Sequence, residues 1–176
     1  AGGLVWTRRA VGQAQGHTPA AGGAVDSFKK VTPGYEAAGV KIAVETHEQM
    51  PTARSLDVSR GVDSPYLGIC SDPTNTVAAL EMPSEVIDAV APYVLNMHVK
   101  DFAFSRKDGW VGFTYAGAPL GEDLLDYDYM VTKFQPHQRN INLVIEHWLP
   151  WQDSEADTIR LENQWTKHSI EFLRSK

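Results

Sequence analysis

The chain has a single cysteine, no long apolar run and no excess of positive charge, and each of these features argues against a class of protein. Cys70 cannot form an internal disulfide, which favours a reducing, cytoplasmic compartment. No apolar stretch approaches the roughly 18 residues of a membrane span, so we expect no membrane partner. The 16 Lys and Arg against 22 Asp and Glu give a net charge of −6, the wrong sign for attraction to phosphate backbones. Nucleic acid is therefore not an expected partner.

The composition that is present is that of an ordinary globular protein. Of 176 residues, 43% are hydrophobic and 22% are charged, which is typical of a chain that folds around a hydrophobic core. A chain of this length can bury a core but has little room for a second one. The composition therefore predicts a single domain over residues 1–176.

Four short apolar runs each end in a side chain that can bind a metal: residues 40–45, 66–72, 94–98 and 141–146. Such near-continuous runs are typical of strands covered on both faces, as in a parallel sheet with helices outside. A fifth candidate strand covers residues 4–6. Helical patterns cover residues 24–38, 83–91, 124–134 and 157–173, and long loops are predicted at 12–23 and 105–121. This alternation predicts an α/β fold with a parallel sheet.

The last residues of the four runs are Glu45, Asp72, His98 and Glu146. A single carboxylate after a strand is more often a helix N-cap or a solvated loop residue. Four candidate ligands at equivalent strand ends are much less readily explained by chance. If the strands are parallel neighbours, three carboxylates meet at one edge of the sheet, where a divalent cation would relieve their repulsion. Oxygen ligands with one imidazole suit Mn²⁺, Mg²⁺ or Co²⁺ better than a structural zinc site.

Five motifs resemble, in order, those of the xylose-isomerase-like barrel superfamily, and most closely its sugar phosphate isomerase/epimerase branch. They are Glu45-Thr46-His47, Gly68-Ile69-Cys70-Ser71-Asp72-Pro73-Thr74-Asn75, His98-Val99-Lys100-Asp101, Gly121-Glu122-Asp123-Leu124-Leu125-Asp126-Tyr127 and Ile145-Glu146. The resemblance extends from about Leu4 to the C-terminus. It implies a (β/α)₈ TIM barrel, here incomplete, with about five of the eight βα units, corresponding to strands 4 to 8.

The resemblance also implies a site and a reaction. One divalent metal ion, Mn²⁺ first and Mg²⁺, Co²⁺ or Zn²⁺ as alternatives, would be held by Glu45, Asp72, His98 and Glu146. Glu45 and Glu146 would act as acid and base on opposite faces of a sugar or keto-sugar, through an enediolate that the metal stabilises. The expected function is therefore a metal-dependent sugar isomerase or epimerase.

Four further residues are candidates for substrate binding. Asn75 stands where related epimerases often carry a substrate-binding His, and His47 lies just beyond a proposed ligand. Lys100 and Arg106 could meet a phosphate, although salt-bridge or solvated roles are at least as frequent for such residues. The motif at Gly121-Glu122-Asp123 departs from the usual Gly-x-Gly.

Two other functions are left open by the sequence. A dehydratase of the inosose type would use the same metal site, because enolate chemistry beside a leaving hydroxyl group eliminates water. A non-catalytic barrel fragment would keep the motifs without a closed site. Since a complete barrel needs about 250 residues, we expect either that the N-terminal units are absent from this sequence or that a second copy of the chain closes the sheet as a homo-oligomer.

Overall fold

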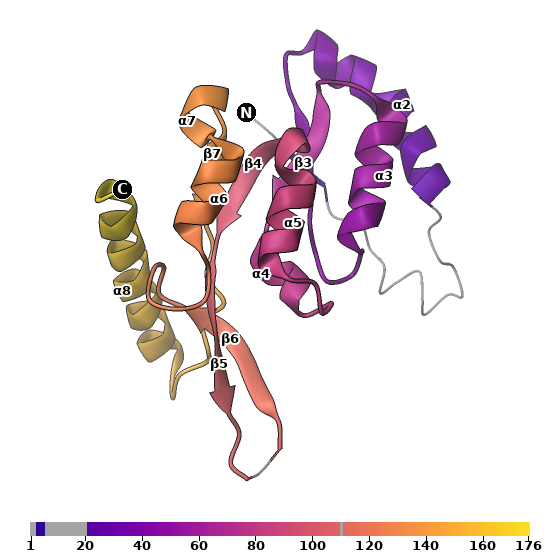
Figure 1. Ribbon diagram of the computed structural model, residues 1–176. Helices are drawn as coiled ribbons and strands as arrows, with labels where there is room; N and C mark the ends of the chain where they lie inside the picture. The colour runs from indigo at the N-terminus through magenta and orange to yellow at the C-terminus, as the bar shows by residue number, and fades with distance from the viewer. Residues whose placement is uncertain (1–2, 6–20, 110) are drawn as a thin grey trace. The chain divides into compact units, whose positions relative to one another are not determined.

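The computed structural model describes residues 3–5, 21–109 and 111–176 (Figure 1). The chain divides into two compact units. The first contains Ala1–Met97 and Met130–Leu143, and the second contains His98–Tyr129 and Val144–Lys176. The single domain over residues 1–176 stays a prediction.

The first unit carries a sheet with the strand order β1-β2-β3-β4-β7, which contains the five strands predicted from the apolar runs. The strands are β1 (Gly3–Val5), β2 (Ile42–Glu45), β3 (Leu67–Ser71), β4 (Val94–Val99) and β7 (Asn142–Ile145), of which β4 and β7 continue into the second unit. β1 to β4 pair in parallel. The register places Glu45 opposite Cys70, and Ser71 opposite Met97. The carboxyl ends of neighbouring strands are thus aligned, as the position of the candidate ligands requires.

Helices pack beside these strands. They are α2 (Ala21–Ala37), α3 (Thr52–Val62), α4 (Pro73–Val77), α5 (Pro83–Val90), the 3₁₀ turn η1 (Ala91–Tyr93), α6 (Tyr127–Phe134) and α7 (Pro136–Arg139). α2 packs on α3, and Phe28, Val44 and Val58 share a buried cluster between these helices and β2. The loop predicted at 12–23 is wrong for residues 21–23, which begin α2, while residues 12–20 lie outside the described part.

The second unit contains an antiparallel hairpin of β5 (Asp101–Arg106) and β6 (Phe113–Ala118), followed later by the long helix α8 (Glu155–Arg174). The hairpin appears in Figure 1 as an extended ribbon. It corrects the prediction of a loop over residues 105–121 at residues 105–106 and 113–118, which are strand. Phe104 and Tyr115 pair across the two strands and stack with ring centroids 5.1 Å apart. Within the described residues, no helix is long and apolar enough to cross a membrane.

Candidate metal centre

Glu45 ends β2 and Asp72 directly follows β3, and both are nearly inaccessible to solvent, with exposed fractions of 8% and 0%. Asp72 is the N-cap of α4, and its Oδ1 accepts a hydrogen bond from the backbone N–H of Asn75 at 3.0 Å. The side chain of Thr46 joins the two strand ends, because its Oγ1 accepts from the N–H of Asp72 at 2.8 Å and donates to the Asp72 carbonyl oxygen at 3.0 Å. Asp72 therefore caps a helix, as expected of a lone carboxylate, and also lies at the edge of the sheet.

Asn75 contacts a candidate ligand directly. Its Nδ2 donates to Oε1 of Glu45 at 2.9 Å, and the side chain is 2% exposed. The amide therefore orients the Glu45 carboxylate, a role that the prediction of substrate binding did not include. Nδ1 of His47 lies 2.7 Å from Oε2 of Glu48. The sequence did not lead us to predict Thr46 as a site residue. Its polar side chain inside the Glu45-Thr46-His47 motif was the signal that could have indicated it.

In the second unit, His98, Lys100 and Glu146 form a connected group. Nδ1 of His98 lies 2.7 Å from Oε2 of Glu146, and Nζ of Lys100 lies 3.1 Å from Oε1 of the same carboxylate. The hydrogen bond from His98 and the charge of Lys100 lower the pKa of Glu146 to about 2, against the opposing effect of burial. Glu146 is therefore ionised at neutral pH.

Lys100 is almost fully buried, with 1% of its surface exposed, and its Nζ lies 4.2 Å from the centroid of the Trp148 ring. Such a contact is attractive because the ring face carries partial negative charge. Trp148 is held in turn by the N–H of Gly117, which donates to its carbonyl oxygen at 3.1 Å. The carboxylate of Glu146 and the ring of Trp148 together place negative charge around this buried group, which offsets its loss of hydration.

Arg106 lies apart from this group of residues. It ends β5, six residues beyond Lys100, and its guanidinium is 5.6 Å from the ring centroid of Phe113. At about 3.3 Å per residue of extended strand, its backbone lies about 20 Å along the hairpin from that of Lys100. The structure therefore brings together His98, Lys100 and Glu146 within the second unit, but not Arg106.

The four residues predicted as ligands make up a candidate set of metal ligands. The set contains three carboxylates and one imidazole, two carboxylates from the first unit and the imidazole and third carboxylate from the second. Carboxylate oxygens with an imidazole nitrogen are the donors that Mn²⁺, Mg²⁺ and related divalent ions take in proteins. The chemistry of the donor set therefore fits a divalent cation. The simultaneous binding of one ion by all four residues is part of the function proposed below.

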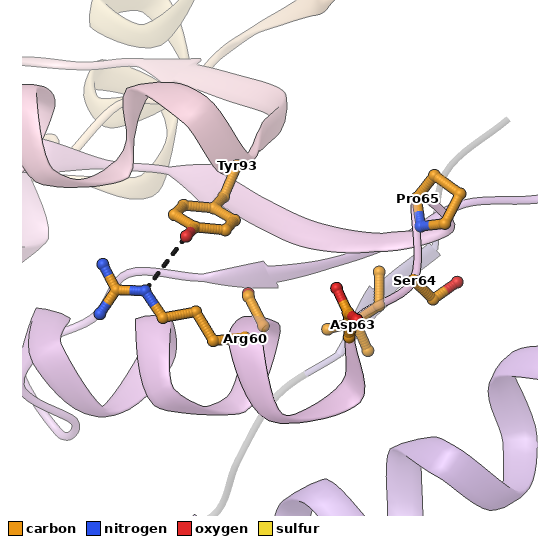
Figure 2. Close-up of a pocket in the computed structure, with 7 residues that line it drawn as sticks. Arg60, Asp63, Ser64, Pro65 and Tyr93 are labelled. Atoms are coloured by element: carbon orange, nitrogen blue, oxygen red, sulfur yellow. Dashed lines mark hydrogen bonds between the residues drawn. The ribbon is translucent and has the colours of Figure 1, made fainter.

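A separate hollow of about 310 Å³ lies in the first unit, between the end of α3 and the start of β4 (Figure 2). Its lining consists of Ser59, Arg60, Asp63, Ser64, Pro65, Leu67 and Tyr93. Nε of Arg60 donates to the hydroxyl oxygen of Tyr93 at 3.1 Å (Figure 2). These lining residues include none of the predicted ligands or substrate-binding residues.

A curated relative and two solved structures resemble the chain. 3-Oxo-isoapionate decarboxylase of Pectobacterium atrosepticum is 49% identical over 160 residues, which cover 91% of this chain and 58% of the relative. A xylose isomerase domain protein from Planctomyces limnophilus has a TM-score of 0.66 at 21% identity and is matched over 86% of this chain and 51% of its own. A xylose isomerase-like TIM barrel protein from Mycobacterium smegmatis, in complex with magnesium, has a TM-score of 0.61 at 18% identity. It is matched over 83% of this chain and 49% of its own.

The chain spans 58% of the curated relative and about half of each of these structures. At these identities the two solved structures support the fold alone. Residues 9–176, nearly the whole sequence, match the family described as the xylose isomerase-like TIM barrel. Together with the parallel sheet and its helices, this match shows that the chain belongs to the xylose isomerase-like TIM barrel family.

Proposed function

We propose that the chain belongs to a divalent-metal-dependent enzyme that acts on a sugar-derived oxo acid and breaks a bond beside its carbonyl group. The observation that carries the proposal is the placement of Glu45, Asp72, His98 and Glu146 at the carboxyl ends of strands, where barrel enzymes build their active sites. The likeness to a 3-oxo-isoapionate decarboxylase supports a sugar acid with a 3-oxo group as the substrate class.

Glu45, Asp72, His98 and Glu146 would hold the ion jointly. A divalent cation bound by them would supply a Lewis acid that favours negative charge on adjacent substrate oxygens. Magnesium, which is present in one of the similar structures, is a candidate beside Mn²⁺, Co²⁺ and Zn²⁺. Asn75 would keep the Glu45 carboxylate oriented through its 2.9 Å hydrogen bond.

Lys100 and Glu146 would define the other side of the site. Because Lys100 and His98 keep Glu146 ionised, this carboxylate is negatively charged at neutral pH and would be available to hold a cation. The buried ammonium of Lys100 also favours a negatively charged group nearby, such as the carboxylate of a sugar acid. The contact with the Trp148 ring limits the movement of the Lys100 ammonium.

Decarboxylation of a 3-oxo acid needs few protein groups. The bond between the carboxyl carbon and the α carbon breaks, its electron pair moves toward the carbonyl oxygen, and the α carbon then takes a proton. The site must therefore stabilise negative charge on oxygen and deliver one proton to carbon. Glu45 would relay that proton from water, because Glu146 is held in its ionised form by His98 and Lys100.

Isomerisation or epimerisation of a keto-sugar is the second candidate. It is favoured by the presence of Glu45 at the end of β2 and of Glu146 directly after β7, since one glutamate can remove the proton that the other returns. Both reactions place negative charge on the same substrate oxygen. They differ in the group that leaves the carbon beside the carbonyl, which is carbon dioxide in decarboxylation and a proton in isomerisation or epimerisation.

One experiment in D₂O separates the candidates. The purified protein is stripped with a chelator, reloaded with Mn²⁺, Mg²⁺, Co²⁺ or Zn²⁺, and incubated with 3-oxo-isoapionate or with ketoses while NMR follows the products. A decarboxylase releases carbon dioxide and places deuterium on the carbon that lost it. An isomerase or epimerase exchanges deuterium without carbon dioxide, and a dehydratase releases water.

Metal content is measured on the same samples. The expected result is one ion per chain, lost in Asp72→Asn but not in the control Glu171→Gln, whose side chain is exposed on α8. Protein that binds no divalent ion and turns over none of these substrates would overturn the proposal in favour of a non-catalytic fragment.

A further inference from the structure

The carboxylate of Asp101 accepts hydrogen bonds from four backbone N–H groups. Oδ1 accepts from Phe102 at 2.8 Å and from Leu125 at 2.8 Å. Oδ2 accepts from Gly121 at 2.9 Å and from Asp123 at 3.1 Å. Asp101 itself is 1% exposed. A carboxylate can accept from all four N–H groups, whereas an amide would present a donor to one pair of them.

These bonds connect two sequence motifs that lie twenty residues apart. Asp101 closes the His98-Val99-Lys100-Asp101 motif, and its three distant donors all lie in the 121–127 motif. The loop is also held from outside, because Gly121 has a φ of 85° and a Cβ there would lie 2.2 Å from the Phe172 ring. Asp101 thus fixes the start of β5 to a loop that α8 covers.

We propose that Asp101 is a positioning residue that sets the place of Lys100 beside Glu146 and Trp148. Lys100 directly precedes Asp101, so the backbone that Asp101 fixes is the backbone from which the Lys100 side chain departs. The ammonium must satisfy two contacts at once, 3.1 Å to Glu146 and 4.2 Å to the Trp148 ring centroid. A displaced backbone would move the point from which the Lys100 side chain starts, and both contacts would then be harder to make together.

The effect on catalysis rests on the proposed function, but the positioning itself can be measured without substrate or metal. The Lys100 ammonium lies 4.2 Å from the Trp148 ring centroid, so the NMR signals of the methylene protons beside it should be shifted upfield from those of exposed lysines. Lysine-labelled protein reports this shift, with Lys100→Arg giving the assignment. Hydrogen exchange at Gly121, Asp123 and Leu125 reports on the loop.

Asp101→Asn is the test variant, because it keeps the shape while turning an amide group toward two N–H donors. We expect the Lys100 signal to move toward that of exposed lysines. Exchange at the amides that lose their acceptor should accelerate by about 10- to 100-fold, as expected for loss of a hydrogen bond to a charged group. The control is Asp126→Asn in the same loop, where Oδ1 caps α6 by accepting from the N–H of Tyr129, a role that Asn also performs. The control should change neither signal.

Faster loop exchange with an unmoved Lys100 signal would overturn the proposal and leave Asp101 as an anchor for the loop alone. If Asp101→Asn does not fold, the wild-type protein decides: an unshifted Lys100 signal, or unprotected amides at Gly121 and Asp123, would equally overturn it. Where turnover is found, Asp101→Asn should lower it in wild type but not further in Lys100→Met. If no substrate is turned over, that result counts against the proposed function. The NMR measurement alone then decides whether Asp101 positions Lys100.

Discussion

Replacing Glu146 separates the charge of this side chain from the hydrogen bonds that it makes. In Glu146→Gln, Oε1 can still accept from Lys100, and the new Nε2 can donate to Nδ1 of His98 if that ring is in its Nε2-protonated tautomer. Both contacts are therefore preserved in a neutral form. The Lys100 ammonium keeps a hydrogen bond but loses its charged partner, so we expect the free energy of unfolding to fall by about 1–2 kcal/mol.

Glu146→Leu should behave differently, because Lys100 then loses the carboxylate 3.1 Å away while its ammonium stays buried. Removing one partner of a fully buried ion pair costs about 3–5 kcal/mol. Since 35% of the Glu146 side chain is exposed and water reaches it, we expect a smaller loss of about 2–3 kcal/mol. Lys100→Met removes the buried charge itself and should change stability by only about 1 kcal/mol.

The measurement is urea unfolding of the three variants beside wild type, followed by fluorescence and circular dichroism, with turnover measured on each. Glu146→Gln should keep the fold and lose turnover by about 10²- to 10⁴-fold, the usual contribution of a general acid or base. If Glu146→Gln and Glu146→Leu lower the free energy of unfolding equally, the hydrogen bond that Gln keeps to the buried Lys100 does not contribute, and the reasoning is refuted. Unchanged turnover in Glu146→Gln would remove this residue from the mechanism.

Three further predictions concern the sheet, the Trp148 contact and the metal. Gly68→Ala places a Cβ 2.3 Å from the carbonyl oxygen of Tyr93, so it should lower the urea midpoint, with a loss of about 1–3 kcal/mol from overpacking. Gly117→Ala places a Cβ 2.6 Å from the carbonyl oxygen of Trp148 and should move the Lys100 NMR signal as Asp101→Asn does. A bound divalent ion at 100 times its Kd should stabilise the protein by about 2.7 kcal/mol, reversed by a chelator and absent in Asp72→Asn, as thermal melts would show.

The strands were predicted well because their signal is local. β2 and β3 are buried along their whole length, so that every residue faces packed protein and the apolar run is continuous. The polar residue that ends each run then marks the sheet edge. The helix α3 gave a weaker signal, since its buried face mixes Ser55 and Ser59 with Leu56, Val58 and Val62. Glycines at 109 and 112 concealed the hairpin, although the alternation across Phe113 and Tyr115 is typical of a strand.

The contacts around the candidate ligands could not be predicted, because they join residues distant in sequence. Nothing near Asn75 indicates that its amide meets Glu45, thirty residues earlier. The same holds for Lys100 and Trp148, whose contact depends on how the hairpin and the segment after β7 pack. Residue type and strand position identify which groups can bind a metal, while tertiary packing decides which neighbours orient them.

The His98-Val99-Lys100-Asp101 motif shows how strand geometry divides the roles of adjacent residues. Side chains in extended backbone alternate between two sides, so residues two apart share one side. His98 and Lys100 accordingly reach the two oxygens of one carboxylate, at 2.7 and 3.1 Å, while Asp101 turns to the 121–127 loop. Inserting or deleting one residue here would exchange these sides and direct a carboxylate, in place of an ammonium, toward Glu146. The spacing of the motif is therefore a physical requirement of a site that keeps Glu146 ionised and its own backbone fixed.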